Sequence, residues 1–253
     1  MHSTVKNSVN KPANITTALL LSAGFGTRLR PITDTIPKCL VPINGKPLLQ
    51  IWLEQLSHIG ITKFIINSHY LAEKVAEFIE NSAFREQVTI FHEPELLGTL
   101  GTLKATKSYW QDENLLIAHA DNLCFASWPA FFERFHQRPK NCLGTMMLFE
   151  SDNPKSCGVV TLDEQQRLLE FFEKIEKPPT NLANAAIYLF DKTLATFIEQ
   201  LSPQGTDISY DLMPKLLGKM NTWLNDGYLR DIGNPESLAI AEQYVASLNR
   251  KSD

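Results

Sequence analysis

Short runs of apolar residues alternate with amphipathic stretches along the first 150 residues of the chain. A continuous apolar run that stops at a glycine or a polar residue is typical of a strand buried on both faces. Apolar residues three and four positions apart indicate a helix instead. The strands expected on this basis are Thr17–Ser22, Lys63–Asn67, Val88–Phe91, Leu115–His119 and Leu143–Phe149. The expected helices are Leu48–Ile59, Leu71–Ile79, Thr102–Trp110 and Trp128–Arg138. Repeated β-α-β units with short connections predict a parallel sheet flanked by helices.

The pattern changes after residue 150. Gly158–Leu162 and Leu168–Lys174 are rich in strand formers and are separated by a polar turn, which predicts an antiparallel hairpin. The remaining expectations are a strand at Ala185–Phe190, helices at Leu194–Leu201 and Ser209–Leu217, a hairpin turn at Asn225–Gly227 before a strand at Tyr228–Asp231, and a helix at Pro235–Leu248. We therefore predict an α/β fold: a Rossmann-like three-layer sandwich with a mixed, mostly parallel central sheet and a small antiparallel sheet on the substrate side.

No linker rich in proline and glycine divides the chain. We predict a single domain over residues 15–253, with one half at about 15–150 and a second at 151–253. Residues 1–14 are polar and lack the apolar core of a signal peptide, so we expect a disordered tail there.

Composition excludes several classes of protein. With 24 basic and 28 acidic residues the net charge is 24 − 28 = −4, and the chain has no long basic cluster, which argues against a nucleic-acid partner. No apolar run approaches the length of a membrane span, so we expect no membrane association. The four cysteines form no C-x-x-C pair, which favours reduced thiols and a cytoplasmic location.

The loop after the first strand contains Gly24-Phe25-Gly26. Glycines at the carboxyl end of a parallel strand let backbone N–H groups approach a phosphate. The spacing does not fit a Walker loop, and Leu29 occupies the position of the third glycine of a dinucleotide fingerprint. A plain turn between a strand and a loop therefore stays open as the alternative when these glycines are considered alone.

The longer string LLSAGFGTRLRPITDTIPKCLVPINGKPLL, Leu20 to Leu49, resembles the signature of the sugar-1-phosphate nucleotidylyltransferases. Four later stretches are similar to further motifs of that family, in the same order along the chain. They are EPELLGTLGTL (Glu93–Leu103), LLIAHADNL (Leu115–Leu123), FFEKIEKPPTNLANAAIYLF (Phe171–Phe190) and YLRDIGNPES (Tyr228–Ser237). Five motifs in order make independent coincidence a poor explanation.

The resemblance implies an enzyme of EC 2.7.7 type that joins a nucleoside monophosphate from an NTP to a sugar 1-phosphate and releases pyrophosphate. It implies catalytic roles for four charged residues. Arg28 would hold the leaving β- and γ-phosphates, Lys38 would lie near the attacking phosphate or the α-phosphate, and Asp121 with Asp231 would bind Mg²⁺ as the cofactor. Residues 15–150 would then be the nucleotide-binding half and residues 151–253 the sugar-phosphate-binding half.

The same resemblance implies two groups of binding residues. The nucleotide-binding group is Leu21, Ala23, Gly24, Gly26, Thr27, Glu95, Gly98 and Thr99. The sugar-phosphate-binding group is Glu176, Lys177 and Asn184. Lys174 competes with Lys177 for the sugar phosphate, and Lys177 is favoured because a proline follows it. Ala120, Ala186 and Asn234 stand where the family commonly has Gly, Gly and Thr, which bears on the choice of sugar.

The short length and the NSHYLA string (Asn67–Ala72) are most similar to the mannose-1-phosphate guanylyltransferase branch, which favours GTP. UTP or dTTP with another hexose, an amino sugar or manno-heptose 1-phosphate stays open. We also expect that the protein can form homodimers.

Rival hypotheses from other classes fit less well. A catalytically silent regulatory paralogue would be expected to lose some of the four charged residues, and all are present. A metal-dependent glycosyltransferase would need a D-x-D motif, which Asp121-Asn122-Leu123 does not supply. A Rossmann dehydrogenase would need the third glycine.

Overall fold

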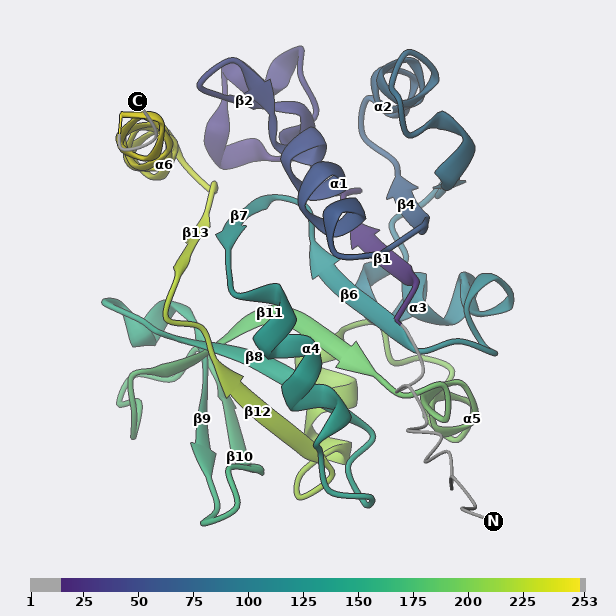
Figure 1. The fold of residues 1–253 in the computed structure, drawn as a ribbon, viewed down its shortest axis with the longest axis vertical. Coiled ribbons are helices and arrows are strands. Elements are labelled where there is room, and N and C mark those ends of the chain that lie inside the picture. The colour runs from purple at the N-terminus through teal and green to yellow at the C-terminus, as the bar shows by residue number, and fades with distance from the viewer. Residues whose placement is uncertain (1–14, 251–253) are drawn as a thin grey trace, which may run out of the picture.

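A computed structural model describes residues 15–250 of the chain. Its first strand, β1 (Thr17–Leu21), lies inside a mixed sheet (Figure 1). The tail expected over residues 1–14 falls outside this range. Within it, nine strands form one sheet, which reads β10-β9-β11-β6-β1-β4-β5 with β8 beside β11 and β12 beside β8. These strands are β4 (Lys63–Ser68), β5 (Val88–His92), β6 (Leu115–His119), β8 (Gly144–Glu150), β9 (Gly158–Leu162), β10 (Leu168–Glu173), β11 (Leu182–Phe190) and β12 (Met220–Leu224).

The strands of the first half run parallel. β1 pairs with β4 and with β6, and β4 pairs with β5. The four carboxyl ends therefore meet at one edge, where an open α/β sheet binds its ligands. This half confirms the parallel sheet that the hydrophobic pattern predicted.

The second half adds antiparallel strands to the same sheet. β11 runs antiparallel to β6, β8 and β9, and the predicted hairpin of β9 and β10 is confirmed. The register of β11 against β8 shifts between Asn184 and Tyr188, where Ala186 has a φ of 55°. β11 bends at this bulge.

Helices cover both faces, which completes the three layers. Ala18 and Leu20 of β1 pack into a core with α1 (Leu48–His58), α2 (Ala72–Glu80), α4 (Trp128–His136) and α6 (Pro235–Asn249). Leu19 and Leu21 point to the other face and pack with α3 (Gly98–Ala105), α5 (Leu194–Glu199) and the π-helical turn η7 (Ile208–Leu212). Alternate residues of one strand thus serve two cores.

The hairpin expected at Asn225–Gly227 is wrong, because the two flanking strands join different sheets. β12 pairs in parallel with β8, whereas β13 (Tyr228–Asp231) pairs antiparallel with β7 (Asn122–Phe125). Gly227 passes the backbone of β7 so closely that a Cβ there would lie 2.2 Å from the carbonyl oxygen of Phe125. The glycine is needed for this crossing and not for a hairpin turn.

Two helix predictions also need correction. The helix expected at Thr102–Trp110 begins earlier, at Gly98, and ends at Ala105 before a 3-10 turn at Lys107–Tyr109. The helix expected at Ser209–Leu217 is the π turn η7 followed by the 3-10 turn Met213–Lys215, because Pro214 cannot donate to a continuing helix. A two-stranded ribbon of β2 (Pro42–Ile43) and β3 (Lys46–Pro47) leads into α1.

None of the helices between residues 15 and 250 is both long enough and apolar enough to cross a bilayer.

Candidate active site

A cavity of about 210 Å³ opens at the carboxyl ends of β1, β4, β5 and β6. Each of these strands contributes a residue that lies at its end or directly after it. The lining residues are Leu21, Ser22, Ala23, Gly24, Lys38, Asn67, Glu93, Leu96, Gly98, Thr99, Thr102, His119 and Asp121. The cavity thus occupies the position in which an α/β sheet of this kind binds a ligand.

The loop after β1 folds back on itself and returns Lys38 to the cavity. It does so through 3-10 turns at Thr27–Leu29, Ile32–Asp34 and Lys38–Leu40. Gly26 has a φ of 63°, and a Cβ there would lie 3.0 Å from Thr33 Cγ2 and 3.2 Å from Lys38 Cβ. The Thr33 hydroxyl donates to the Gly26 carbonyl at 2.7 Å and closes the loop. A glycine at position 26 therefore lets the two ends of the loop touch.

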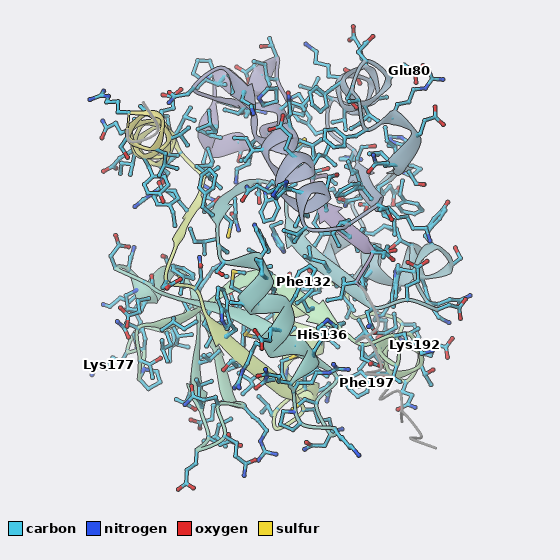
Figure 2. The ribbon with its side chains drawn as sticks, in the orientation of Figure 1. Glu80, Phe132, His136, Lys177, Lys192 and Phe197 are labelled. Carbon is cyan, nitrogen blue, oxygen red and sulfur yellow. The ribbon has the colours of Figure 1, made fainter. Side chains whose placement is uncertain are left out.

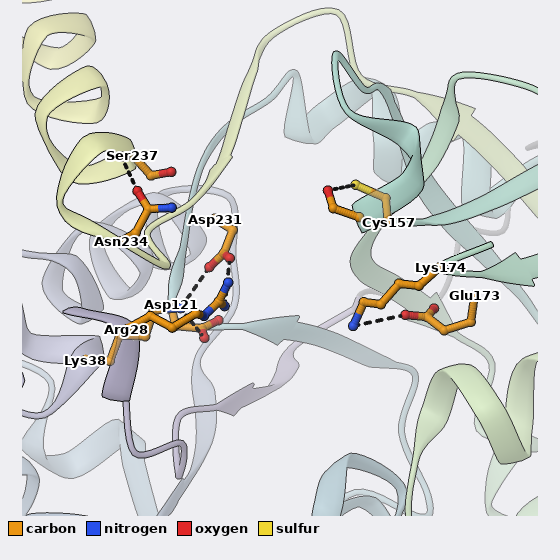
Figure 3. Close-up of polar contacts among 10 residues, drawn as sticks. Arg28, Lys38, Asp121, Cys157, Glu173, Lys174, Asp231, Asn234 and Ser237 are labelled. Atoms are coloured by element: carbon orange, nitrogen blue, oxygen red, sulfur yellow. Dashed lines mark hydrogen bonds and ion pairs between the residues drawn. The ribbon is translucent and has the colours of Figure 1, made fainter. Parts of the chain in front are cut away.

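A cluster of four charged side chains lies beside the cavity (Figure 3). Lys38 Nζ donates to Asp121 Oδ2 at 2.7 Å and to Asp231 Oδ1 at 2.8 Å. Arg28 Nη2 lies 3.4 Å from Asp231 Oδ2. Gly233 permits this approach, since a Cβ there would lie 2.5 Å from Asp231 Oδ2 and 3.0 Å from Arg28 Nη2. The structure thus brings together all four residues for which a catalytic role was predicted.

The two cations of this cluster differ in exposure. The side chain of Lys38 is 8% exposed and that of Arg28 is 71% exposed. Burial by itself would lower the pKa of Lys38, but the facing carboxylates of Asp121 and Asp231 outweigh it and raise the pKa above its usual value. Burial would likewise raise the pKa of Asp121, yet Lys38 and His119 hold it below its usual value. Lys38 therefore stays charged beside the ionised Asp121 carboxylate.

Asp121 and Asp231 are a suitable pair of ligands for Mg²⁺. Mg²⁺ is commonly held by one or two carboxylates together with substrate phosphates and water. The two carboxylates converge on one point, the Lys38 ammonium, although they come from positions 110 residues apart (231 − 121 = 110). No cluster of three or more His, Cys, Asp or Glu side chains suited to a metal occurs in the described range 15–250. The donor set fits a metal that is bound jointly with a phosphate better than an all-protein metal site.

Part of the cavity lining is a buried hydrogen-bond network. Glu93 is 1% exposed, and its Oε1 accepts from Asn67 Nδ2 at 2.9 Å and from the Thr102 hydroxyl at 2.5 Å. Its Oε2 accepts from the Leu97 backbone N–H at 3.1 Å. Asn67 Oδ1 in turn accepts from the Ser22 N–H at 2.7 Å. One carboxylate thus ties together the ends of β1, β4 and β5 and the start of α3. We call Ser22, Asn67, Glu93 and Thr102 the nucleotide wall.

Five of the eight predicted nucleotide-binding residues line the cavity, namely Leu21, Ala23, Gly24, Gly98 and Thr99. Gly26 and Thr27 lie in the loop beyond it, and Glu95 is exposed outside it. The predicted site residues did not include six others that line the cavity, namely Ser22, Asn67, Glu93, Leu96, Thr102 and His119. A signal was present for Asn67 and Glu93, since each stands at the end of a predicted strand, as Asp121 does.

The predicted sugar-phosphate residues are not among the residues that line the cavity. The Glu176 side chain is 96% exposed and lies 3.8 Å from Lys155 Nζ. Lys177 is exposed at the margin of the molecule (Figure 2). Asn184 Oδ1 accepts from the Ala186 N–H at 2.9 Å, and its Nδ2 donates to the Tyr188 hydroxyl at 2.7 Å, so this amide stabilises the bulge of β11.

Lys174 occupies a different position, at the end of β10. It has a φ of 50°, and its backbone N–H donates to the Cys157 carbonyl at 3.1 Å. Its Nζ lies 3.4 Å from Glu173 Oε1, and its side chain points toward the side on which Lys38 and Asp231 lie (Figure 3). We call Glu173 and Lys174 the sugar wall, after the ligand that the resemblance predicts for this half of the chain.

The structure shows the surroundings of the three departures from the family pattern. Asn234 caps α6, because its Oδ1 accepts from the Ser237 N–H at 2.8 Å, and Thr is also a good cap residue (Figure 3). Ala186 adopts a positive φ that glycine would adopt without strain. Ala120 is fully buried and donates its N–H to the Leu21 carbonyl at 2.9 Å.

Comparison with known proteins agrees with this geometry. The family profile described as nucleotidyl transferase matches residues 17–247. A nucleotidyltransferase of low-salt glycan biosynthesis from Haloferax volcanii is 31% identical over 234 residues, which cover 90% of this chain and 65% of the relative. A mannose-1-phosphate guanylyltransferase from Mycobacterium tuberculosis is 32% identical over 226 residues, covering 87% of this chain and 61% of the relative. The chain thus spans less than two thirds of the length of these relatives.

Solved structures show the same fold. A protein of Yersinia pseudotuberculosis named HddC matches with a TM-score of 0.77 and 25% identity, over 91% of this chain and all of that one. An apo UDP-glucose pyrophosphorylase matches with a TM-score of 0.78 and 19% identity, over 93% and 100% of the two chains. The profile match over nearly the whole described range and relatives above 30% identity lead to one conclusion: the chain belongs to the nucleotidyl transferase family.

Proposed function

We propose that this protein is a sugar-1-phosphate nucleotidylyltransferase, which transfers a nucleoside monophosphate from an NTP to a sugar 1-phosphate. The observation that carries the proposal is Lys38, held at 2.7 and 2.8 Å from Asp121 and Asp231 beside the cavity of the glycine loop. Two carboxylates that could hold a metal ion and a buried cation at one cavity suit a reaction whose reactants and products are all polyanions.

In this reaction an oxygen of the sugar phosphate attacks the α-phosphorus of the NTP. The new bond is sugar–phosphate oxygen to Pα, the broken bond is Pα to the bridging oxygen of the β-phosphate, and pyrophosphate leaves with that electron pair. A phosphate monoester carries a negative oxygen at pH 7, so no side chain has to remove a proton. Catalysis therefore rests on positioning and charge neutralisation.

The proposed roles follow from exposure. Arg28 is exposed and held by one long ion pair, so its guanidinium can turn to the leaving β- and γ-phosphates. Lys38 is buried and fixed, which suits a point charge at the α-phosphate. Asp121 and Asp231 would hold Mg²⁺, which when bound would polarise phosphate oxygens and neutralise their charge. The glycine loop would contribute backbone N–H groups to the triphosphate.

We further propose that Lys174, rather than Lys177, meets the sugar phosphate. Lys174 extends toward the charge cluster from the end of β10, whereas Lys177 lies at the margin of the molecule. Glu173 would then take the part first expected of Glu176, while Asn184 would shape the pocket by holding the bulge of β11.

For the base we propose guanine, since the Mycobacterium tuberculosis relative is named a mannose-1-phosphate guanylyltransferase. UTP or dTTP with another hexose, an amino sugar or manno-heptose 1-phosphate is the alternative. All four cysteines are free, which accords with a reducing compartment, and we propose a cytoplasmic location. Association into homodimers stays a prediction for light scattering to check.

One experiment tests the reaction class and the substrates together. Pyrophosphate release is measured for ATP, CTP, GTP, UTP and dTTP against mannose, glucose, N-acetylglucosamine and manno-heptose 1-phosphates, with and without Mg²⁺. We expect one strong NTP and sugar-phosphate pair, with GTP and mannose 1-phosphate first, and no release when Mg²⁺ is chelated. The Lys38→Ala variant is the matched blank. Release from no pair would favour the silent paralogue.

A further inference from the structure

Residues 202–212, in the second half of the chain, exchange hydrogen bonds with the first turn of α3. We call this segment the strap. Leu100 N–H donates to the Thr206 carbonyl at 2.8 Å, and Gly101 N–H approaches the same oxygen at 3.4 Å. In return the Ile208 N–H donates to the Thr99 hydroxyl oxygen at 2.8 Å. The strap and α3 therefore hold each other through a reciprocal set of hydrogen bonds.

This contact uses groups that a helix normally leaves without a partner. The first N–H groups of an α-helix have no acceptor inside the helix and are satisfied by caps, water or ligands. Here the Thr206 carbonyl is that acceptor. Gly98 makes the approach possible, because it has a φ of 73° and a Cβ there would lie 2.5 Å from the Thr206 oxygen. The glycine is therefore required by the strap, not only by a ligand.

One carboxylate and one lysine hold the strap in shape. Asp211 Oδ2 accepts from the N–H groups of Thr206 at 2.8 Å and of Asp207 at 2.9 Å. Lys104, which projects from α3, donates to the carbonyls of Ser202 at 2.8 Å and Gly205 at 2.9 Å. Asp211 thus aims the Thr206 carbonyl at α3, and Lys104 anchors the other end of the strap.

Thr99 shows why this matters for the cavity, which it lines. A hydroxyl has one hydrogen to donate and two lone pairs. The Ile208 N–H occupies one lone pair, so the Thr99 hydrogen stays free to donate to an acceptor in the cavity. The strap thus fixes the position of both Gly98 and Thr99 on the cavity wall without lining the cavity itself.

We propose that the strap is a positioning element for the nucleotide site and that Asp211 acts as a positioning residue through the Thr206 carbonyl. The identity of the ligand rests on the proposed function, but the hydrogen-bonded contact between the strap and α3 does not. Loosening the strap removes binding that the ground state and the transition state share, so NTP affinity falls while the turnover number holds.

The test compares Asp211→Ala with Asp211→Asn in the full chain. Asn keeps a carbonyl oxygen that can accept both N–H groups, so it should stay within twofold of the parent protein. Asp211→Ala should raise the GTP Kd by calorimetry and the GTP KM about tenfold, with kcat and the sugar-phosphate KM within twofold. Hydrogen exchange of the Leu100 and Gly101 amides should accelerate in Asp211→Ala alone.

A control variant separates positioning from general destabilisation. Asp163→Ala also removes a carboxylate that accepts two backbone N–H groups, those of Gln165 and Arg167 at 2.9 Å, but in the β9–β10 turn. It should leave GTP affinity and α3 exchange unchanged. If Asp211→Ala fails to fold, Lys104→Met loosens the anchor with Lys107→Met as its control, since Lys107 pairs instead with Glu199.

The outcomes distinguish the strap from the proposed function. Unchanged α3 exchange in both Asp211→Ala and Lys104→Met would overturn the link, and faster exchange with GTP affinity within twofold would overturn the positioning role. If the parent protein binds none of the five NTPs, the proposed function fails. The exchange data then still decide whether the strap holds α3.

Discussion

The two walls differ in how firmly their side chains are held. Glu93 of the nucleotide wall is 1% exposed and receives hydrogen bonds only from neutral donors, namely Asn67, Thr102 and a backbone N–H. Lys174 of the sugar wall has a side chain that is 61% exposed and one ion pair, to Glu173. Hydrogen bonds fix the shape of the first wall, whereas the second presents an exposed side chain to solvent. Under the proposed roles, the NTP would meet a preformed site and the sugar phosphate would be drawn to an exposed lysine.

The largest expected effect on activity comes from a substitution in the charge cluster beside the cavity. Asp121→Asn keeps the shape of the side chain but removes one of the two charges expected to hold the metal. We expect kcat to fall about a hundredfold or more, equivalent to about 2.7 kcal/mol of transition-state stabilisation. The matched control is Asp191→Asn, which removes a carboxylate paired with Arg138 at 2.6 Å, away from the cavity. Near-normal turnover in Asp121→Asn would refute the metal role.

A stability measurement tests how firmly the nucleotide wall is built. Glu93→Ala removes the acceptor shared by the Asn67 amide, the Thr102 hydroxyl and the Leu97 N–H, so we expect the free energy of unfolding to fall by about 2–3 kcal/mol. Urea denaturation measures the change. Glu176→Ala, at a side chain that is 96% exposed, should stay within about 0.5 kcal/mol. A small loss in Glu93→Ala would mean that the wall is looser than its hydrogen bonds imply.

A pair of lysine variants tests the sugar wall. Lys174→Ala should raise the KM for the sugar 1-phosphate about tenfold, since one exposed charge contact to a phosphate is lost, and leave the KM for the NTP within twofold. Lys177→Ala should leave both constants within twofold. The reverse ranking would restore Lys177 to the role that its proline suggested.

The smallest expected effect concerns the thiols of Cys39 and Cys157. Cys39 is fully buried, and burial raises its pKa to about 12; Cys157 is partly exposed beside the sugar wall. At pH 8 a maleimide should therefore label Cys157 first and Cys39 only on unfolding, as peptide mass mapping would show. A folded-state pKa of about 12 against 9.0 also means that the contribution of Cys39 to stability is full below pH 9 and is lost as pH rises toward 12. Rapid native labelling of Cys39 would contradict the buried assignment.

Sequence reasoning succeeded where a local pattern and the tertiary environment agree. β6 matches its prediction residue by residue, because an uninterrupted apolar run has no other stable place than the sheet interior. β12 was missed because it buries Asn221 and Thr222, whose polarity hides the strand. The Asn225–Gly227 sequence predicted a break before the strand at Tyr228–Asp231, and that break is present. It does not specify which strands β12 and β13 pair with.

The same reasoning applies to the candidate site. The proximity of Arg28, Lys38, Asp121 and Asp231 could be predicted because each belongs to a motif with fixed spacing. The different positions of Lys174 and Lys177 could not be predicted, because they depend on where β10 ends and on the positive φ of Lys174. The residues around Lys174 do not determine either property.

The strap also has a consequence for the order of events on the ribosome. The loop after β1, the cavity-lining strand ends and α3 have all been synthesised by residue 150, whereas Thr206, which accepts from the first turn of α3, follows only after another stretch of translation. Asp231 follows later still and completes the charge cluster. A nascent chain that ends near residue 150 therefore lacks both the acceptor that holds α3 and one carboxylate of the cluster, so the proposed nucleotide site is complete only when the second half has been synthesised.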